Sequence, residues 1–199
     1  MSKSSAVFDI QKLFWINRHY LKESVPERLI SLTIPILQAS GWVAEVDGPI
    51  QSWIGRLVDV ALPRINHLSQ IVEIADSLCG YRASEIIHSG EVQEVFRIAA
   101  ATDVVQELCR QLSDSTGDVS KNWKDIVTAV KSRTGQKGKS LFHPIRIALT
   151  GTTSGPELDK LVPLFEEGSR LPLSRKVKNC CQRTCELVEA LAIFNNSPS

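Results

Sequence analysis

The sequence predicts an all-α protein, a multi-helix bundle or cage made of two packed helical subdomains. Apolar residues recur at the three-and-four spacing of one helix face along most of the chain. No window shows the sustained alternation of β-branched residues that is typical of strands, and no internal repeat is evident. With 199 residues, of which 43% are hydrophobic, the chain is long enough to bury a packed core.

The N-terminal part carries the strongest local signals for helices. Asp9 is placed to cap a first helix with one apolar face, which we expect to be buried. That face carries Leu13, Phe14, Ile16 and Tyr20. Ser24 and Glu27 form an S-x-x-E capping box around Pro26, which predicts the start of a second helix. Residues 64–78 are expected to form a further helix.

Glycines and charged residues separate the helices expected in the middle of the chain. From Ser89 the apolar pattern predicts one long helix or two abutting helices, which end at residues 116–118. A short helix around Trp123 follows. It ends in a loop at residues 134–139, whose glycines and charges cannot sustain a buried helical face.

The last third of the chain is expected to hold three more helices. Pro144 and Pro156 are each placed to begin one, since proline is favoured in the first turn, and Ser174 is placed to cap the last. We therefore place the first helical subdomain at residues 9–115 and the second at residues 116–195.

Composition excludes several kinds of protein. The chain has 23 Lys and Arg against 22 Asp and Glu, so its net charge of +1 does not by itself indicate a nucleic-acid or membrane partner. No apolar stretch suits a bilayer span or a signal peptide, which predicts a cytoplasmic protein without a membrane partner. The five cysteines lack metal-ligand spacing and the four histidines are dispersed. We therefore expect no metal site and no catalytic Cys–His pair.

The charges are segregated along the chain even though their sum is small. Residues 121–146 contain seven basic residues against one acid, Asp125, whereas residues 73–107 are mostly acidic. The seven are Lys121, Lys124, Lys131, Arg133, Lys137, Lys139 and Arg146. A second basic run follows, with Arg170, Arg175, Lys176, Lys178 and Arg183. Such runs can neutralise RNA phosphates, but from composition alone an ordinary solvated face is the more economical interpretation.

Two motifs carry a resemblance to a known family. Residues 4–20, S-S-A-V-F-D-I-Q-K-L-F-W-I-N-R-H-Y, are similar to the pattern K-S-x-A-x-F-D-x-x-K-L-x-W-x-N-x-x-Y. Residues 138–151, G-K-S-L-F-H-P-I-R-I-A-L-T-G, are similar to G-K-x-L-F-x-P-L-R-x-A-L-T-G, and G-P-E-L follows at residues 155–158. Both patterns are those of bacterial glutamyl-tRNA synthetases, so the chain resembles the C-terminal anticodon-binding region of these enzymes.

The resemblance implies a helical fold of the class I glutamyl-tRNA synthetase type that holds the anticodon arm of a tRNA, with tRNA-Glu as the expected partner. ATP and glutamate would belong to an absent catalytic domain, because the sequence has no H-I-G-H-like motif and no Gly-rich strand-to-helix turn. We therefore expect no catalytic residue, no cofactor and no aminoacylation by this chain alone. Residues 1–8 would be the linker from the catalytic domain, which is a second expected partner, and residues 196–199 a frayed tail.

The basic runs and the resemblance together select the candidate tRNA-binding residues. Arg18 would contact the tRNA stem, and Lys137 and Lys139 its phosphates. The candidates for contact with unstacked anticodon bases are Arg64, His67, Arg146 and Thr150. Residues 64–70 depart from the family's E-R-x-R-T-L pattern, which bears on the choice of tRNA more than on general RNA affinity.

Two alternatives stay open at this point. Arg146 could form an internal salt bridge instead of binding RNA. The chain could also be a helical protein-interaction scaffold that keeps the fold and no longer binds tRNA, a use that an exposed apolar patch would favour. Binding that weakens steeply with salt would indicate phosphate contacts, since apolar protein contacts barely respond to salt.

Overall fold

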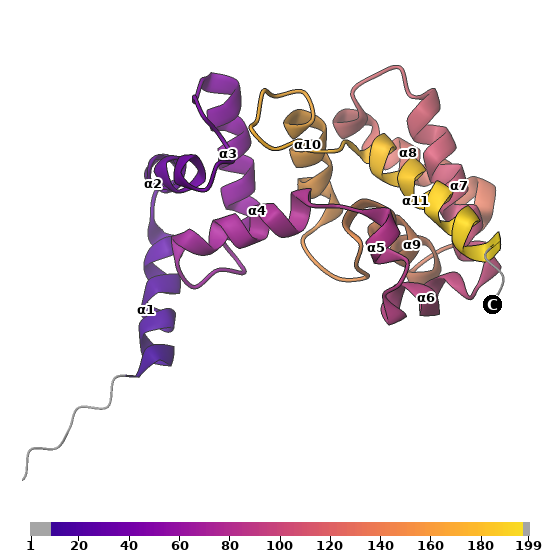
Figure 1. Ribbon diagram of the computed structural model, residues 1–199, viewed down its shortest axis with the longest axis horizontal. Helices are drawn as coiled ribbons and strands as arrows, with labels where there is room; N and C mark the ends of the chain where they lie inside the picture. The colour runs from indigo at the N-terminus through magenta and orange to yellow at the C-terminus, as the bar shows by residue number, and fades with distance from the viewer. Residues whose placement is uncertain (1–8, 197–199) are drawn as a thin grey trace, which may run out of the picture. The chain divides into compact units, whose positions relative to one another are not determined.

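The computed structural model describes residues 9–196, which form α-helices, one 3₁₀-helix and no strand (Figure 1). The predicted all-α fold is confirmed. The chain divides into two compact units, Met1–Ala75 and Asp76–Ser199, and the division falls inside α4. The linker predicted at residues 1–8 and residues 197–199 of the predicted tail lie outside the described residues.

The first unit is built on the packing of two helices, α2 against α3. Its elements are α1 (Ile10–Glu23), α2 (Pro26–Ala39), α3 (Gly48–Ala61), η1 (Leu68–Gln70) and the start of α4 (Ile71–Cys79). Trp53, Ile54 and Leu57 of α3 are completely buried, and Leu29 and Leu37 of α2 are buried with them. The apolar side chains of α3 recur at three-and-four spacing, which places them on the face that meets α2.

Helix α1 begins as predicted but does not bury its apolar face. Asp9 caps it, because the carboxylate Oδ1 accepts hydrogen bonds from the backbone N–H groups of Gln11 (2.9 Å) and Lys12 (3.2 Å). None of its residues is buried, and the side chains of Trp15 and Tyr20 are 63% and 66% exposed. The prediction of a buried face is therefore wrong within the described part of the chain, where Phe14 and Ile16 are half-buried and the rest of this face is exposed.

The capping box predicted at Ser24 is also wrong. The Ser24 hydroxyl donates to the carbonyl oxygen of Tyr20 at 2.7 Å, so it closes α1 instead of opening the next helix. Helix α2 begins at Pro26 with Val25 at the N-cap, and no side chain caps it. The helix predicted over residues 64–78 forms only from Leu68 onward, first as η1 and then as α4.

The second unit is organised around α7, which packs against α6, α8, α9 and α11. Its elements are the end of α4, α5 (Ala83–Ile86), α6 (Gly90–Phe96), α7 (Ala99–Asp114), α8 (Val119–Thr134), α9 (Lys139–Thr150), α10 (Leu158–Gly168) and α11 (Cys180–Asn196). The sequence placed a subdomain boundary at residue 115. Here residues 115–118 are a short connection between two helices that pack on each other inside one unit.

Two glycines end the helices on either side of the second sequence motif. Gly135 (φ 68°) closes α8 and Gly151 (φ 80°) closes α9, both in the left-handed conformation that side chains disfavour. Gly151 also allows a close approach, since a Cβ there would lie 2.8 Å from Cδ1 of Ile86. Pro144 does not begin α9 as predicted but lies inside it, after the first turn.

Helix α11 begins later than the sequence indicated. Ser174 does not cap it; the helix starts at Cys180 instead. The side-chain oxygen of Asn179 accepts from the backbone N–H of Gln182 at 2.8 Å, and the side-chain oxygen of Gln182 accepts from the N–H of Asn179 at 3.0 Å. This reciprocal pair is a capping box that supplies the start signal.

Candidate nucleic-acid interface

The connection between α8 and α9 gathers exposed positive charge at the beginning of a helix. Lys137 and Lys139 are exposed, and Gly138 between them is the N-cap of α9 with φ 57° and no side-chain capping bond. The first backbone N–H groups of a helix point outward without intrahelical partners and carry a partial positive charge. Two lysines and an uncapped helix start therefore form a surface suited to an anion such as a phosphate.

Arg146 and Thr150 lie toward the other end of α9 and take part in contacts within the protein. The Arg146 guanidinium donates to the carbonyl oxygen of Pro156 at 2.6 Å. The Thr150 hydroxyl donates to the carbonyl oxygen of Arg146 at 2.8 Å and also lies 3.2 Å from the hydroxyl of Thr152. Both side chains thus fix the loop between α9 and α10. The bond that holds Arg146 to the loop is to a backbone carbonyl.

The four candidates of the second unit therefore form two pairs. Lys137 and Lys139 lie at the start of α9, and Arg146 and Thr150 lie in its last two turns. Eleven residue steps separate Lys139 from Thr150, which is about 16 Å along the helix axis at about 1.5 Å per residue. A single base could not contact both ends, whereas a segment of RNA several nucleotides long could.

The first unit holds the other three candidates. Arg64 is exposed in the loop after α3 and Arg18 is exposed on α1. His67 is half-buried, its Nδ1 lies 2.8 Å from the hydroxyl of Ser69, and its ring centroid lies 6.2 Å from that of Phe14. Arg18 follows Phe14 by four residues and so lies on the same side of α1. The structure therefore places Arg18 on the side of α1 that faces His67.

The second basic run is mostly engaged within the protein, which corrects its interpretation as a phosphate-binding surface. Arg183 is completely buried. Its guanidinium donates to the carbonyl oxygens of Lys178 (2.8 Å), Leu149 (2.8 Å) and Leu78 (2.9 Å), and it lies 3.7 Å from the ring centroid of Phe165. Arg183 thus joins α4, α9 and α11 from inside and cannot reach an RNA.

Three neighbours of Arg183 in the same run also have partners. Lys178 donates to the carbonyl oxygen of Tyr81 at 3.0 Å and forms an ion pair with Glu186. Arg175 pairs with Asp76, and Arg170 lies 3.6 Å from the carboxylate of Glu166. The side chains of the second basic run therefore bind carboxylates and carbonyls of the second unit itself. Their charge is less available to phosphate than the sequence suggested.

The first basic run also has partners within the protein, among them Asp118, which lies 3.9 Å from Lys121. Arg133 of α8 lies 3.3 Å from the carboxylate of Glu107, which also accepts hydrogen bonds from Arg110 at 2.7 and 2.9 Å. The hydrogen bonds from Arg110 lower the pKa of Glu107 to about 2, with the nearby positive charges acting in the same direction. Arg133 thus belongs to an ion-pair network on α7 and α8, which leaves Lys137 and Lys139 as the exposed cations of the following loop.

Other kinds of site find little support among residues 9–196. No cluster of His, Cys, Asp or Glu in this range has an arrangement that could hold a metal ion. All five cysteines are free thiols, and burial raises the pKa of Cys79 to about 11, so that this thiol stays protonated at neutral pH. Across the same range, no helix combines the length and the apolar character needed to cross a membrane.

Comparison with known proteins connects this surface to a family. The sequence-family model described as the anticodon binding domain matches residues 28–168, more than half of the chain. The match includes all four candidates on α9 and its preceding loop together with Arg64 and His67, and excludes Arg18.

Similar curated proteins are named glutamate–tRNA ligase. The protein of Bacillus subtilis is 34% identical over 166 residues, which cover 83% of this chain and 34% of that protein. The protein of Bacillus licheniformis is 37% identical over 172 residues, with the same coverage of 83% and 34%. The chain thus spans about a third of the length of the curated relatives it matches.

A solved structure shows the same fold. It is described as a glutamate tRNA ligase from Elizabethkingia meningosepticum in complex with its amino acid, and it matches with a TM-score of 0.65. The match covers 95% of this chain and 34% of that one at 17% identity, so it supports the fold alone. The family match and the curated relatives show that the chain belongs to the anticodon-binding domain family and is similar to a part of glutamate–tRNA ligases.

Proposed function

We propose that this chain is a tRNA-binding module that holds the anticodon arm of a tRNA, with tRNA-Glu as the expected one, and that it performs no ligation by itself. The match to the anticodon binding domain over residues 28–168 is the observation that carries the proposal. ATP and glutamate would bind in a catalytic region that accounts for the remaining length of the relatives.

The charge distribution supports RNA as the ligand. Lys137, Lys139 and the start of α9 face solvent together, so phosphate groups can reach them without displacing a protein partner. Each phosphate contact made by a lysine releases counterions from the RNA, which makes the affinity depend on salt. Arg146 and Thr150 would contribute by fixing the loop at residues 151–156, because their hydrogen bonds tie this loop to α9.

Binding of unfractionated tRNA and of tRNA-Glu across a salt series tests the proposal. We expect the affinity to fall steeply with salt, and the slope to shrink by about one for each of Lys137→Ala and Lys139→Ala. Lys160→Ala is the matched control, because this exposed lysine of α10 lies 3.6 Å from Glu157 and is outside the proposed surface. The absence of tRNA binding at low salt would contradict the proposal, and equal affinity for all tRNAs would restrict it to general RNA binding.

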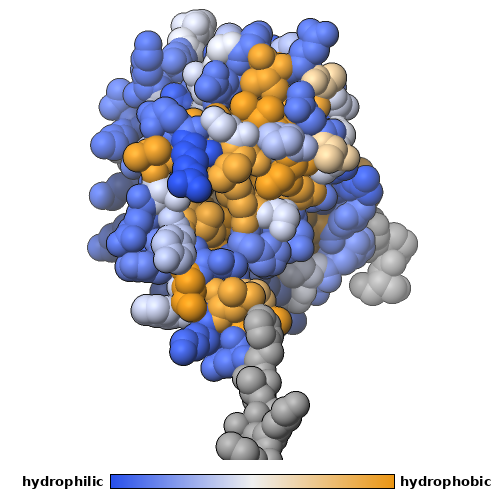
Figure 2. Space-filling view, turned by 90° about the vertical axis from the view of Figure 1, so that its left-hand side faces the viewer, coloured by the Kyte–Doolittle hydropathy of each residue, from blue (hydrophilic) through white to orange (hydrophobic). Residues whose placement is uncertain are grey.

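The apolar side chains of the first unit support a second element of the proposal, attachment to a catalytic region. Figure 2 shows apolar side chains gathered on one side of the molecule. Exposed apolar residues of α1, α2 and their connection are Ile10, Leu13, Trp15, Tyr20, Val25 and Leu32. A group of exposed apolar side chains marks an interface with another protein surface. The relatives are about three times as long as the matched part, which makes their remaining region the expected occupant.

A mixing experiment tests this attachment. We expect the chain to form a complex with the part of the Bacillus subtilis ligase that it does not match, observed by analytical ultracentrifugation. Trp15→Asp should abolish the complex, since it places a charge in the apolar face, whereas the same change at an exposed polar site, Gln51→Asp on α3, should leave it intact. If the two proteins sediment separately, the proposed attachment is contradicted.

A further inference from the structure

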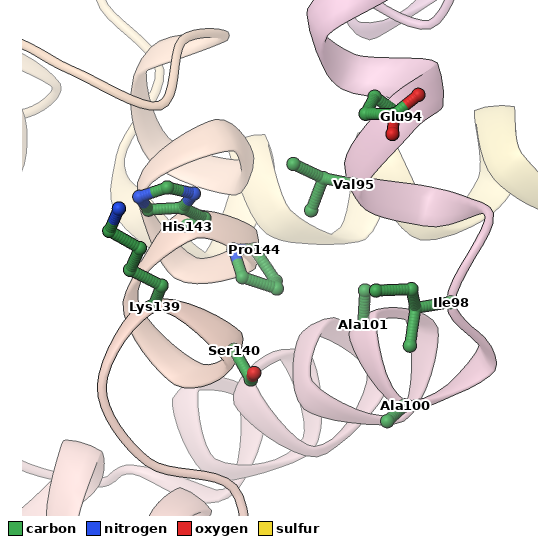
Figure 3. A pocket seen from close by; sticks show the side chains of 9 residues that line it. All are labelled: Glu94, Val95, Ile98, Ala100, Ala101, Lys139, Ser140, His143 and Pro144. Carbon is green, nitrogen blue, oxygen red and sulfur yellow. The ribbon is translucent and has the colours of Figure 1, made fainter.

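A pocket of about 230 Å³ lies in the second unit between the first half of α9 and the connection from α6 to α7 (Figure 3). Its walls are largely apolar, with Val95 of α6 and Ile98 of the connection facing Pro144 of α9 across the pocket. Lys139 and His143, one turn apart on α9, line its edge, and Figure 3 shows their side chains extending away from Val95 and Ile98. Apolar walls with a few polar groups at the edge are typical of a ligand site.

Ile98 is an unusual residue for its position. It is the N-cap of α7, a place where Ser, Thr, Asp or Asn is strongly preferred because the side chain can bond the free backbone N–H groups. It makes no capping bond, and its side chain is 64% exposed. Ile98 therefore neither caps the helix nor belongs to the buried core. Positions that break local rules in this way are expected at functional sites.

The charge around the pocket suits a ligand that is itself anionic beside an apolar part. Lys139 lines the pocket, and Lys137 precedes it by two residues at the uncapped start of α9. The acid on the opposite side, Glu94, is paired with Arg97 at 3.0 Å, which reduces its repulsion of an anion. Single-stranded RNA has the matching chemistry, because it presents flat apolar bases joined by phosphates.

We infer that this pocket takes a single unstacked RNA base, with the adjoining phosphate at Lys137, Lys139 and the start of α9. The inference rests on the proposed tRNA binding and adds a base subsite to it. The volume of the pocket limits its occupant to a single base. It is about 230 Å³, less than the roughly 300–1,000 Å³ of sites that enclose a whole small molecule. The aliphatic walls contact the faces of the base and do not distinguish one base from another.

Substitution of Ile98 by asparagine tests the base subsite. The change removes the apolar wall without adding charge, and it places a preferred residue at the N-cap of α7, so the fold is expected to gain and not to lose stability. We expect Ile98→Asn to weaken binding of tRNA and of a short single-stranded RNA by about five-fold, from the loss of base contact. The salt dependence should not change, because the phosphate contacts remain.

Two further measurements separate base contact from other effects. Ile193→Asn is the matched control, since Ile193 is 69% exposed in the same unit and does not line the pocket. Ala100→Leu fills the pocket while keeping it apolar, and it should weaken RNA binding as Ile98→Asn does. An RNA of the same length without bases should bind wild type and Ile98→Asn equally, because only the phosphate contacts are then available.

The outcomes distinguish this inference from the proposed function. If Lys137→Ala and Lys139→Ala weaken tRNA binding while Ile98→Asn and Ala100→Leu have no effect, the chain binds tRNA and the base subsite is refuted. The subsite is also refuted if Ile98→Asn weakens the base-free RNA as much as the normal RNA. If no RNA binds even at low salt, the proposed function fails first, and the subsite with it.

Discussion

Replacing Arg183 with methionine should destabilise the second unit by about 3 kcal/mol. The substitution leaves three carbonyl oxygens, those of Leu78, Leu149 and Lys178, without their donor. A buried acceptor without a partner costs roughly 1–3 kcal/mol. Methionine retains apolar contact with Phe165, and it removes the cost of burying a cation, the effect that lowers the pKa of Arg183. The three carbonyls together would cost about 3–9 kcal/mol. Because methionine offsets part of this cost, we expect a net loss near the lower value.

A loss of this size is large against the roughly 5–15 kcal/mol that stabilises a typical domain. Urea unfolding followed by circular dichroism measures it, and the midpoint should fall by about 1.5 M if the slope is about 2 kcal/mol/M. Arg183→Lys should lose less than Arg183→Met, because an ammonium keeps the charge and can still donate to some of the three carbonyls, although it lacks the fork of the guanidinium. Arg170→Met is the control, since its side chain is 62% exposed and its ion pair is long, at 3.6 Å.

Equal midpoints for Arg183→Met and Arg170→Met would refute the reasoning. Such a result would mean that the three carbonyls find water or that the apolar replacement recovers the whole cost of burying the cation, as happens in some proteins with buried ion pairs. A change confined to the slope would instead indicate an altered denatured state.

Three further predictions concern stability. Thr33→Val should raise the free energy of unfolding by about 1 kcal/mol, because the Thr33 hydroxyl is buried without a hydrogen-bond partner, and thermal unfolding would show a higher midpoint. Gly151→Ala should lower the thermal midpoint more than Gly135→Ala: both glycines have positive φ, but only at Gly151 would the new Cβ meet a neighbour, at 2.8 Å. Glu107 stabilises the fold above its unfolded pKa of about 4.5, and this contribution is lost as the pH falls toward its folded pKa of about 2. The stability difference between wild type and Glu107→Gln should therefore shrink between pH 5 and pH 3 in urea titrations, and a constant difference would contradict the assignment.

The helical fold could be predicted from the sequence because apolar spacing is a local property that tertiary packing rarely overrides. The starts of helices were less predictable, and Ser24 shows why. Its hydroxyl can close the preceding helix or open the following one, and the sequence does not say which. Pro144 was expected to begin a helix, whereas α9 starts five residues earlier because Gly138 has the positive φ that allows the chain to turn there.

The candidate site was predictable only where charge is exposed. Lys137 and Lys139 were found from the charge pattern, since glycines keep their segment out of the core. Arg183 was misassigned because it was grouped with neighbouring cations. Its helical spacing from Cys180 and Leu187, both buried, could have placed it on the inner face of α11. The exposed position of Ile98 required the structure, because it depends on where α6 ends and α7 begins.

The bare apolar face of α1 has a thermodynamic consequence. A helix of 14 residues with none of them buried is near the length at which isolated helices are marginal in water. A partner that covers Trp15 and Tyr20 would therefore also shift the helix–coil equilibrium of α1, so that association and folding of this segment are one process. Calorimetry should then record a negative heat-capacity change larger than rigid docking of the same surface would give, and part of the contact energy would go to ordering the helix.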